Sequence, residues 1–366
     1  MAVTSQAINK TINKTGRLPD PAFWQGRRVL LTGHTGFKGA WMSLLLHRLG
    51  AKVTGLALPP RDETSLFTIL GDRTGTEHHI ADLRDAAAIA HAVRTARPSI
   101  VLHLAAQALV PAGYDDPAGT FAINCDGTIN VLQAMRGVAG IEAALLVTTD
   151  KVYRNRNDGR RFAEDDPLGG EDPYSASKAA AEIAIASWRA SYARDLPRLV
   201  VARAGNVIGG GDFAPSRLVP DIVRAVARGE TLLLRHPGAT RPWQHVLDVA
   251  IGYLLQVEHA VASSDFPQVL NFGPIEKDEI SVRDLVLGFE RAFGLTLTQG
   301  LVGNAKPEAS RLALDPTLAC TTLGWASRFD RKATIEATAA WYAAWTRGED
   351  MAARTIAEAE HALSYH

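Results

Sequence analysis

Short apolar runs alternate with longer segments of helical periodicity over the first 205 residues, and this alternation constrains the fold most strongly. Continuous apolar runs bounded by turn or polar residues are typical of strands buried on both faces. The order predicts βαβ units around a parallel sheet, an α/β doubly wound fold. The expected strands are residues 29–32, 53–58, a weak strand near 80, 100–104, 145–149 and 199–203, with helices over 40–49 and 175–192.

A glycine-rich loop follows the first expected strand. Gly33, Gly36 and Gly39 have the spacing G-x-x-G-x-x-G and open a helix. Glycines let a backbone turn sharply and approach a pyrophosphate, which the helix N-terminus attracts. The alternative is an ordinary strand-to-helix turn. The place between strand and helix favours a Rossmann-type dinucleotide site.

The residues leave the choice between NAD and NADP open. A carboxylate about 20 residues beyond the glycine loop normally binds the adenosine ribose of NAD. Residues 55–60 contain no carboxylate, and Arg61 is the first charged residue. Asp82 and Leu83 follow the third expected strand and are candidates for the adenine edge. A helix N-cap is an equal alternative for Asp82.

Tyr174 and Lys178 lie one turn apart on one face of the helix expected after Pro173. A phenol with an ordinary pKa of about 10 is a weak base, but an ammonium and a cationic nicotinamide stabilise the phenolate. The pair predicts a general base that takes a proton from a sugar hydroxyl. Tyr-x-x-x-Lys is also common on solvated helices, and its place after the fifth strand favours catalysis.

The fifth expected strand ends in Thr148-Thr149-Asp150-Lys151, at the sheet edge where doubly wound folds bind ligands. Thr149 can bind a substrate hydroxyl. Asp150 offers an acid that expels a hydroxyl, and Lys151 offers a base that removes a carbon-bound proton. The alternative is a turn with a solvated ion pair. An acid beside a base predicts elimination.

A chain of 366 residues exceeds what one hydrophobic core usually supports, which predicts two lobes. From Gly205 onward the pattern loosens into segments punctuated by Gly and Pro. We expect a flexible tail over 1–22, an NAD-binding Rossmann domain over 23–205 plus 244–272, and a smaller C-terminal substrate-binding lobe over 206–243 plus 273–366. The Ala-rich residues 333–362 predict terminal amphipathic helices.

Charge and cysteine content exclude several classes of protein. Lys plus Arg and Asp plus Glu both total 39, so no field attracts a polyanion and we expect no nucleic-acid partner. The only cysteines, Cys125 and Cys320, fit a reducing compartment. Without a signal-like apolar core or a run of roughly 18 apolar residues, we expect a soluble cytoplasmic protein with no membrane partner. The eleven His residues show no ligand spacing with the cysteines, so we expect no metal.

Several motifs resemble those of the extended short-chain dehydrogenase/reductases, and among these the CDP-glucose 4,6-dehydratases, from about residue 23 to 345. Lys151 favours the CDP-sugar group, because related dTDP-glucose dehydratases carry Glu there. Beside the glycine loop and the Tyr/Lys pair, the motifs that carry the resemblance are Phe23-Trp24, Thr149-Asp150-Lys151, DPLGG over 166–170, RAGNVIGGGD over 203–212 and RPWQHV over 241–246.

The resemblance implies NAD as cofactor, CDP-glucose as the nucleotide sugar, a role in deoxysugar synthesis for lipopolysaccharide O-antigen, and a homo-oligomer, dimer or tetramer. The implied catalytic residues are Thr149, Asp150, Lys151, Tyr174 and Lys178. The implied cofactor-binding residues are Gly33, Thr35, Gly36, Phe37, Lys38, Gly39, Asp82, Leu83, Ala105 and Ala106, together with Tyr174 and Lys178. The implied substrate-binding residues are Gln107, Asn206, Arg217, Leu218 and Arg241.

Two pairs of residues keep simpler alternatives. Arg217 and Arg241 suit a diphosphate because a guanidinium fork matches its oxygens, and the alternative is two surface arginines on loops. By resemblance His34 and Lys38 weaken cofactor retention, and the alternative is plain solvent exposure. The chain also departs from the family: residues 110–114 lack its Arg and Ser, Val152 replaces a Cys, and 154–162 lacks its tryptophans. These departures bear on the sugar more than on the reaction.

The reaction that the resemblance implies is redox-neutral. Tyr174 deprotonates the C4 hydroxyl as C4 gives its hydride to NAD, and the 4-ketone acidifies C5. Lys151 takes the C5 proton while Asp150 protonates the departing C6 hydroxyl, and the hydride returns to C6. A nucleotide-sugar 4-epimerase, which needs no elimination pair, and a 4,6-dehydratase for another nucleotide hexose are the alternatives. A non-catalytic NAD-sensing protein would share the fold alone.

Overall fold

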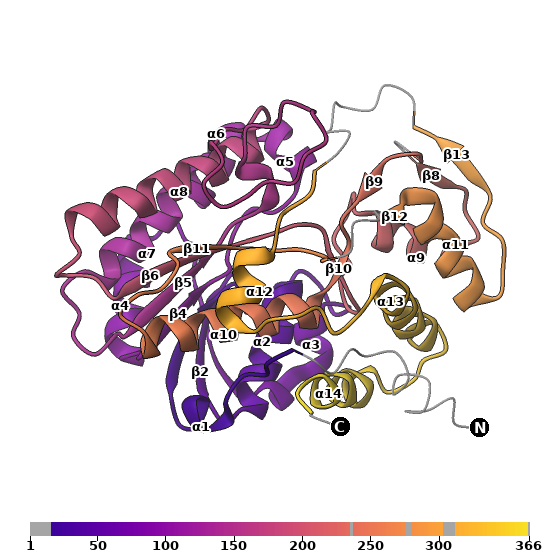
Figure 1. Cartoon of the computed structure of the whole chain (residues 1–366). Helices are drawn as coiled ribbons and strands as arrows, with labels where there is room; N and C mark the ends of the chain where they lie inside the picture. The colour runs from indigo at the N-terminus through magenta and orange to yellow at the C-terminus, as the bar shows by residue number, and fades with distance from the viewer. Residues whose placement is uncertain (1–15, 235–236, 276–279, 303–311, 365–366) are drawn as a thin grey trace.

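The structure of the chain is a computed structural model that describes residues 16–234, 237–275, 280–302 and 312–364. A seven-stranded parallel sheet forms its centre, in the order β11-β6-β5-β4-β1-β2-β3 (Figure 1). Its strands are β1 Arg28–Thr32, β2 Lys52–Ala57, β3 Thr76–Ile80, β4 Ile100–His103, β5 Ala143–Val147, β6 Arg198–Ala204 and β11 Val269–Phe272. The strand order reverses between β1 and β4, which is the switch point where doubly wound folds bind ligands.

The predicted Rossmann-type α/β fold is confirmed, and all six predicted strands are present. β5 ends at Val147, so Thr148 and Thr149 lie beyond the strand and not within it. The seventh strand, β11, was not predicted as a strand, because Asn271 interrupts its apolar run after two residues.

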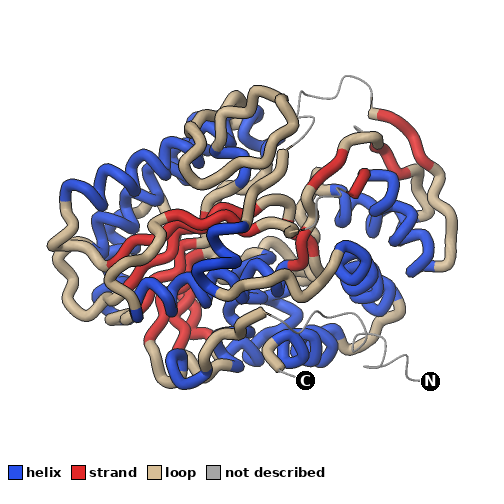
Figure 2. The backbone as a smooth tube through the Cα atoms, in the orientation of Figure 1, coloured by secondary structure: helices blue, strands red, loops and turns tan. Residues whose placement is uncertain are grey.

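Helices cover the sheet on both faces, as Figure 2 shows. Leu30 packs into a cluster with α4 Ala86–Ala96, α7 Gly127–Met135 and α8 Pro173–Ser191. Leu31 packs into a second cluster with α2 Phe37–Arg48 and α10 Val246–Ala262. Neighbouring residues of one strand point to opposite faces, and both faces are buried. This double burial is why the strands read as continuous apolar runs.

The second part of the molecule lies beside the carboxyl end of the sheet (Figure 1). It contains three two-stranded pairings, β10-β7, β12-β9 and β13-β8. The predicted domain boundaries stay predictions, while helices are present in the Ala-rich end as α13 and α14. The remaining elements are α1 Pro21–Trp24, α3 Leu66–Leu70, η2 Gly71–Thr74, α5 Val110–Asp115, α6 Pro117–Phe121, η3 Ala122–Asp126, η4 Asp150–Val152, β7 Val207–Ile208, α9 Leu218–Arg228, β8 Leu232–Leu234, β9 Thr240–Arg241, β10 Gln244–His245, β12 Ile280–Ser281, α11 Val282–Phe293, β13 Gln299–Leu301, α12 Thr317–Leu323, α13 Arg331–Thr346 and α14 Met351–Ala362.

The predicted flexible tail is wrong for residues 16–22, which pack against the rest of the chain. Leu18 is buried in the core. The Arg17 guanidinium, the Asp20 backbone N–H and the Trp24 indole N–H all donate to the Glu258 carboxylate on α10, at 3.0, 2.8 and 2.8 Å. A contact across more than 230 residues leaves no local pattern in the sequence. Residues 1–15 of the predicted tail lie outside the described residues.

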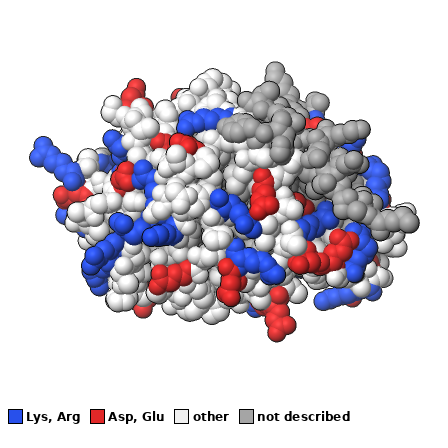
Figure 3. All heavy atoms as spheres, turned by 90° about the horizontal axis from the view of Figure 1, so that it is seen from below, with Lys and Arg blue, Asp and Glu red and all other residues white. Residues whose placement is uncertain are grey.

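Positive and negative side chains are interspersed on the face that Figure 3 shows. This mixture agrees with the equal totals of basic and acidic residues. Within the described residues, the helices are all too short or too polar to cross a membrane.

Replacing Trp24 with Phe is expected to lower the free energy of unfolding by about 1–3 kcal/mol, because it removes a buried N–H donor from the Glu258 carboxylate. Urea unfolding measures this loss. Trp188→Phe is the matched control, since the Trp188 indole N–H is buried with no hydrogen-bond partner among the described residues. Equal losses in both variants would contradict the importance of the Trp24 contact.

Candidate active site

Three loops meet at the carboxyl edge of the sheet, and the start of α8 lies beside them. They follow β1, β4 and β5, which are neighbours in the sheet. Because parallel strands all end at the same edge, residues that are far apart in sequence come together there. The site therefore gathers the glycine loop, Ala105, Ala106 and the segment 149–151.

Two glycines of the loop allow close backbone contact. Gly33 has a φ of +78°, and a Cβ there would lie 2.7 Å from the backbone of Ala105. A Cβ on Gly39 would lie 2.0 Å from the carbonyl oxygen of Gly33. These contacts press the start of α2 against the ends of β1 and β4, so both positions require glycine.

Gly36 serves a different purpose. Its φ of −78° and ψ of 169° suit any residue, and it is the N-cap of α2 with no side-chain cap. A Cβ there would meet only the Gly33 carbonyl oxygen, at 3.3 Å. The space before the helix N-terminus is therefore open, and the N–H groups there suit the pyrophosphate of a dinucleotide. The glycine loop fits NAD by this test.

The other residues expected near the cofactor lie around this loop. The Thr35 hydroxyl donates to the Leu58 carbonyl oxygen at 3.0 Å, and the Ala105 N–H donates to the Thr32 hydroxyl at 3.2 Å. Ala106 follows Ala105 directly, and Phe37 is the first residue of α2.

Asp82 and Leu83 lie just beyond β3. The N-cap alternative for Asp82 is wrong, because Asp85 caps α4. Asp82 instead accepts hydrogen bonds from the backbone and the guanidinium of Arg84, and the bonds to the Arg84 side chain lower the pKa of its carboxyl. The Leu83 side chain is buried in the cluster beneath α4 and α7. Asp82 therefore already has a partner within the chain.

His34 is fully buried, so the solvent-exposure alternative is wrong for this residue. Its Nε2 bonds to Nδ1 of His78, and its ring packs edge-to-face against Phe67 at 5.0 Å. Burial, and then repulsion by His78, lowers the pKa of His34 to about 4. A neutral imidazole therefore fills the space between the glycine loop and β3.

Lys38, the second residue of α2, also lies at this site. Its Nζ lies 3.5 Å from the Tyr253 hydroxyl. Burial, and then repulsion by Lys178 and Arg217, lowers the pKa of Lys38 to about 7. The Lys38 side chain is thus close enough to the expected catalytic residues for their charges to change its pKa.

Thr149, Asp150 and Lys151 form a compact hydrogen-bonded turn. The Thr149 hydroxyl and the Lys151 ammonium both donate to Oδ1 of Asp150, at 2.9 and 3.1 Å. Oδ2 of Asp150 is buried and has no partner among the described residues, and a Cβ on Gly205 would lie 3.2 Å from it. The alternative of a solvated ion pair is wrong for Asp150, which is fully buried. One carboxylate oxygen is held while the other is available to a ligand.

The charge state of Lys151 follows from its neighbours. Burial acts to lower its pKa, but attraction to Asp150 and Tyr174 outweighs burial, so the pKa is raised above its usual value. Lys151 therefore rests as an ammonium beside Asp150. Moving one proton along the 3.1 Å contact gives an amine and a carboxylic acid without changing the net charge.

Tyr174 and Lys178 both lie buried on α8, whose N-cap, Asp172, accepts from the backbone N–H of Ser175. Burial raises the pKa of Tyr174, and attraction to Lys151 and a hydrogen bond with Thr149 oppose that rise. The Lys178 ammonium instead donates to the Val147 carbonyl oxygen at 3.0 Å, and burial lowers its pKa to about 8. We expected the Lys178 ammonium to stabilise the Tyr174 phenolate. In the structure the ammonium that acts on the phenol is that of Lys151.

The two arginines expected at the substrate lie near the turn. Arg217 donates to Asp212 at 2.8 Å, and its charge also attracts a proton away from Tyr174. Arg241 donates to the Thr240 carbonyl oxygen at 2.9 Å, and its charge acts on Lys151. Both side chains are partly buried rather than freely exposed.

Three other expected substrate residues have structural contacts. Both ends of the Gln107 side-chain amide are held, by the Leu109 N–H at 2.6 Å and the Thr120 hydroxyl at 3.0 Å. The Asn206 carbonyl oxygen accepts from the backbone N–H of Gln244, and Leu218 begins α9. No group of three or more His, Cys, Asp or Glu side chains in the described part of the chain could hold a metal ion.

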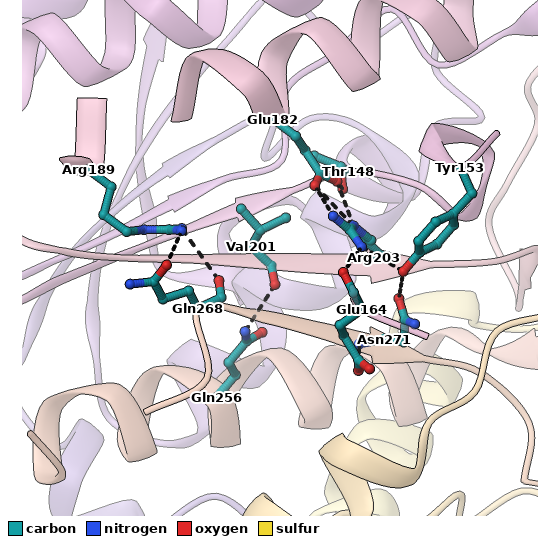
Figure 4. Close-up of polar contacts among 10 residues, drawn as sticks. All are labelled: Thr148, Tyr153, Glu164, Glu182, Arg189, Val201, Arg203, Gln256, Gln268 and Asn271. Carbon is teal, nitrogen blue, oxygen red and sulfur yellow. Dashed lines mark hydrogen bonds and ion pairs between the residues drawn. The ribbon is translucent and has the colours of Figure 1, made fainter. Parts of the chain in front are cut away.

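The sequence analysis did not identify Glu182, a buried carboxylate next to the turn 149–151 (Figure 4). Glu182 accepts from the Thr148 hydroxyl at 2.5 Å and from the Arg203 guanidinium. A signal was present, because Tyr174, Lys178 and Glu182 follow one another at every fourth position of α8 and share a helix face.

Comparison with known proteins places these residues in a family. The model of the NAD dependent epimerase/dehydratase family matches residues 29–273. The CDP-glucose 4,6-dehydratase of Salmonella typhimurium is 40% identical over 340 residues, which cover 91% of this chain and 95% of that protein. The dTDP-glucose 4,6-dehydratase 1 of Escherichia coli is 25% identical over 355 residues, covering 88% and 94%.

Solved structures of epimerases and dehydratases have a similar fold. A UDP-glucose-4-epimerase from Stenotrophomonas maltophila, crystallised with NAD and a formylated UDP-arabinopyranose, superposes with a TM-score of 0.77. It is 27% identical, and the match covers 88% of this chain and 99% of that one. A dTDP-glucose 4,6-dehydratase from Streptomyces venezuelae with NAD bound has a TM-score of 0.74 and 25% identity, covering 86% and 96%.

Replacing Gly36 with Leu is expected to weaken NAD binding by at least about tenfold, or 1.4 kcal/mol, because the side chain fills the open space before α2. Calorimetric titration with NAD measures the affinity. The melting temperature without NAD serves as the control and should fall little, since the Gly36 backbone suits any residue and only the Gly33 carbonyl oxygen must yield to the new Cβ. Unchanged NAD affinity would remove the glycine loop from the cofactor site.

Proposed function

Because the chain belongs to the NAD dependent epimerase/dehydratase family, we propose that it is a CDP-glucose 4,6-dehydratase. It is an NAD-dependent nucleotide-sugar dehydratase that converts CDP-D-glucose to CDP-4-keto-6-deoxy-D-glucose. The observation that carries the proposal is the buried Asp150 paired with Lys151 beside Tyr174. An elimination needs both an acid and a base at one place.

Tyr174 takes the proton of the C4 hydroxyl. NAD held at the glycine loop 33–39 would supply a positive charge and the hydride carrier that C4 reduces and C6 reoxidises. Thr149 is hydrogen-bonded to the phenol, and the charges of Lys151 and Arg217 attract a proton away from it, so these two cations favour the phenolate against burial. Lys178 donates to the Val147 carbonyl oxygen, and this hydrogen bond holds its ammonium in the place expected for it beside the cofactor.

Asp150 and Lys151 carry out the loss of water. Lys151 in its amine form takes the C5 proton, which the 4-ketone has made acidic, and Asp150 gives its proton to the departing C6 hydroxyl. The C5–C6 double bond that forms is then reduced at C6, and Lys151 returns the proton to C5. The proton gained by Tyr174 balances the one that Asp150 gave to water. The reaction is therefore redox-neutral.

The remaining expected contacts extend this proposal. Arg217 and Arg241 bind the diphosphate of the substrate, as planar guanidinium groups do well, with Gln107, Asn206 and Leu218 around the sugar nucleotide. NAD is bound by the glycine loop, Gly33 to Gly39, together with Asp82, Leu83, Ala105 and Ala106. The ammonium of Lys38 and the buried ring of His34 reduce the retention of the cofactor.

We also propose a setting for the enzyme. It acts in the cytoplasm as a homodimer or homotetramer, and its product enters deoxysugar synthesis for lipopolysaccharide O-antigen. This setting is what the resemblance to the CDP-glucose 4,6-dehydratases implies.

Incubation with NAD and CDP-glucose deuterated at C4 is expected to give a product that has lost one water and carries the label at C6. In heavy water, solvent deuterium is expected at C5, because Lys151 exchanges its proton before returning it. Mass spectrometry and NMR of the product measure both. UDP-glucose and dTDP-glucose, run in parallel, test the base and should react more slowly.

A different label pattern would favour the rival reaction. Several solved structures similar to this chain are 4-epimerases, which return the hydride to C4. Retention of the label at C4 without loss of water would therefore replace the dehydratase by an epimerase. Absence of any turnover with all nucleotide hexoses would refute both.

Tyr174→Phe is expected to lower kcat by at least about 10²-fold, the usual effect of a missing general base, while the dissociation constant for CDP-glucose stays nearly the same. Steady-state kinetics and calorimetric titration measure the two quantities. Tyr192→Phe is the control, since Tyr192 ends the same helix and contacts Arg136 rather than the site. Normal turnover by Tyr174→Phe would exclude this phenol as the base.

A further inference from the structure

A buried carboxylate lies directly behind the candidate catalytic residues. Glu182 follows Lys178 by one turn of α8, and its side chain is 4% exposed. It accepts from the Thr148 hydroxyl at 2.5 Å and from Arg203 through Nε at 2.9 Å and Nη2 at 2.5 Å (Figure 4). Removing one partner of such a buried, hydrogen-bonded ion pair is costly.

Arg203 connects Glu182 to the segment that follows the catalytic turn. Its Nη1 donates to the Tyr153 hydroxyl at 2.6 Å and to the Glu164 carbonyl oxygen at 2.9 Å. The Tyr153 hydroxyl in turn donates to Asn271 on β11 at 2.7 Å. Thr148 and Tyr153 stand immediately before and after the segment 149–152, so one ion pair fixes both ends of that segment.

Glu182 is also the negative charge that acts on Lys178. Burial lowers the pKa of Lys178 to about 8, and attraction to Glu182 opposes this effect. Among the described residues, Lys178 also interacts with Lys38 from α2, which repels it, and with His103 from β4. Burial, and then Lys178 itself, lowers the pKa of His103 to about 3, so this side chain is neutral. β5 contributes only the neutral carbonyl of residue 147.

We propose that Glu182 is a positioning residue of the active site, which is held by Arg203 and Thr148 and keeps Lys178 in its ammonium form. This inference rests on the proposed function, because that function gives Lys178 its role at the cofactor. It adds a residue that touches neither substrate nor cofactor. Glu182 acts through Lys178 and through the ends of the turn.

The expected direction of the effect follows from the charges. Neutralising Glu182 removes the attraction that holds a proton on Lys178. Loss of this attraction lowers the pKa of Lys178 further below about 8. Lys178 then loses its proton at lower pH, so activity on the alkaline side falls at lower pH than in the native enzyme.

The test uses Glu182→Gln, which keeps the size of the side chain and removes its charge. Lys178 is expected to titrate about one pH unit lower, a tenfold change in the ratio of its two forms. The ¹³Cε resonance of Lys178, identified by its loss in Lys178→Arg, measures the titration directly. The pH profile of kcat/KM with CDP-glucose is the second measurement, and its alkaline limb should move by the same amount.

Glu258→Gln is the matched control. Glu258 lies on α10 and is 3% exposed, while its partner Arg17 is 47% exposed, so the variant neutralises an equally buried carboxylate that belongs to a different ion pair. Both variants should melt at lower temperature, but only Glu182→Gln should change the titration of Lys178. Glu182→Asp, which keeps the charge, should leave the titration close to native even if Glu182→Gln does not fold.

Two results would overturn the inference. One is an unchanged Lys178 titration in folded Glu182→Gln, and the other is a drop of about one unit in Glu182→Asp or in Glu258→Gln. The failure of the proposed function looks different: the native chain would not dehydrate CDP-glucose, while the resonance of Lys178 would still report the effect of Glu182.

Discussion

The burial of a parallel sheet on both faces is the constraint on which the rest of this structure depends. Helices can cover both faces only if each strand is followed by a crossover, and the strands then all end at one edge. At that edge the glycine loop after β1 meets Ala105 after β4 and the turn after β5. The candidate site is thus a consequence of how the core is covered, and its residues come from distant parts of the sequence.

Burial sets the electrostatics at this edge, and the contacts of each group decide the outcome. Lys151 and Lys178 are both subject to desolvation, yet their pKa values move in opposite directions. Lys151 touches the Asp150 carboxylate at 3.1 Å, whereas Lys178 donates to a neutral carbonyl oxygen. Pairing with a full charge offsets the loss of water, and pairing with a dipole offsets less of it. The two lysines therefore differ in how readily they release a proton.

The fold is shared by enzymes that return a hydride to different carbons, so the fold alone does not determine the reaction. The glycine loop and the Tyr174–Lys178 pair suit oxidation at C4 in either case. The Asp150–Lys151 contact adds an acid and a base that an epimerase does not need. In the proposed reaction this single dipeptide carries the distinction, and Oδ2 of its carboxylate, which has no hydrogen-bond partner among the described residues, would face the leaving group.

The sequence by itself determined six of the seven strands of the sheet, the helix that bears Tyr174 and Lys178, and the segments that form the site, because each has a local period or a local spacing. Tertiary structure decided the rest. The docking of residues 16–22 on Glu258, the capping of α4 by Asp85 instead of Asp82 and the pairing of Glu182 with Arg203 were not predicted. Docking and pairing join side chains distant in the chain, and which carboxylate caps a helix depends on the backbone that the packed fold imposes. Their geometry exists only once the sheet and its helices have packed.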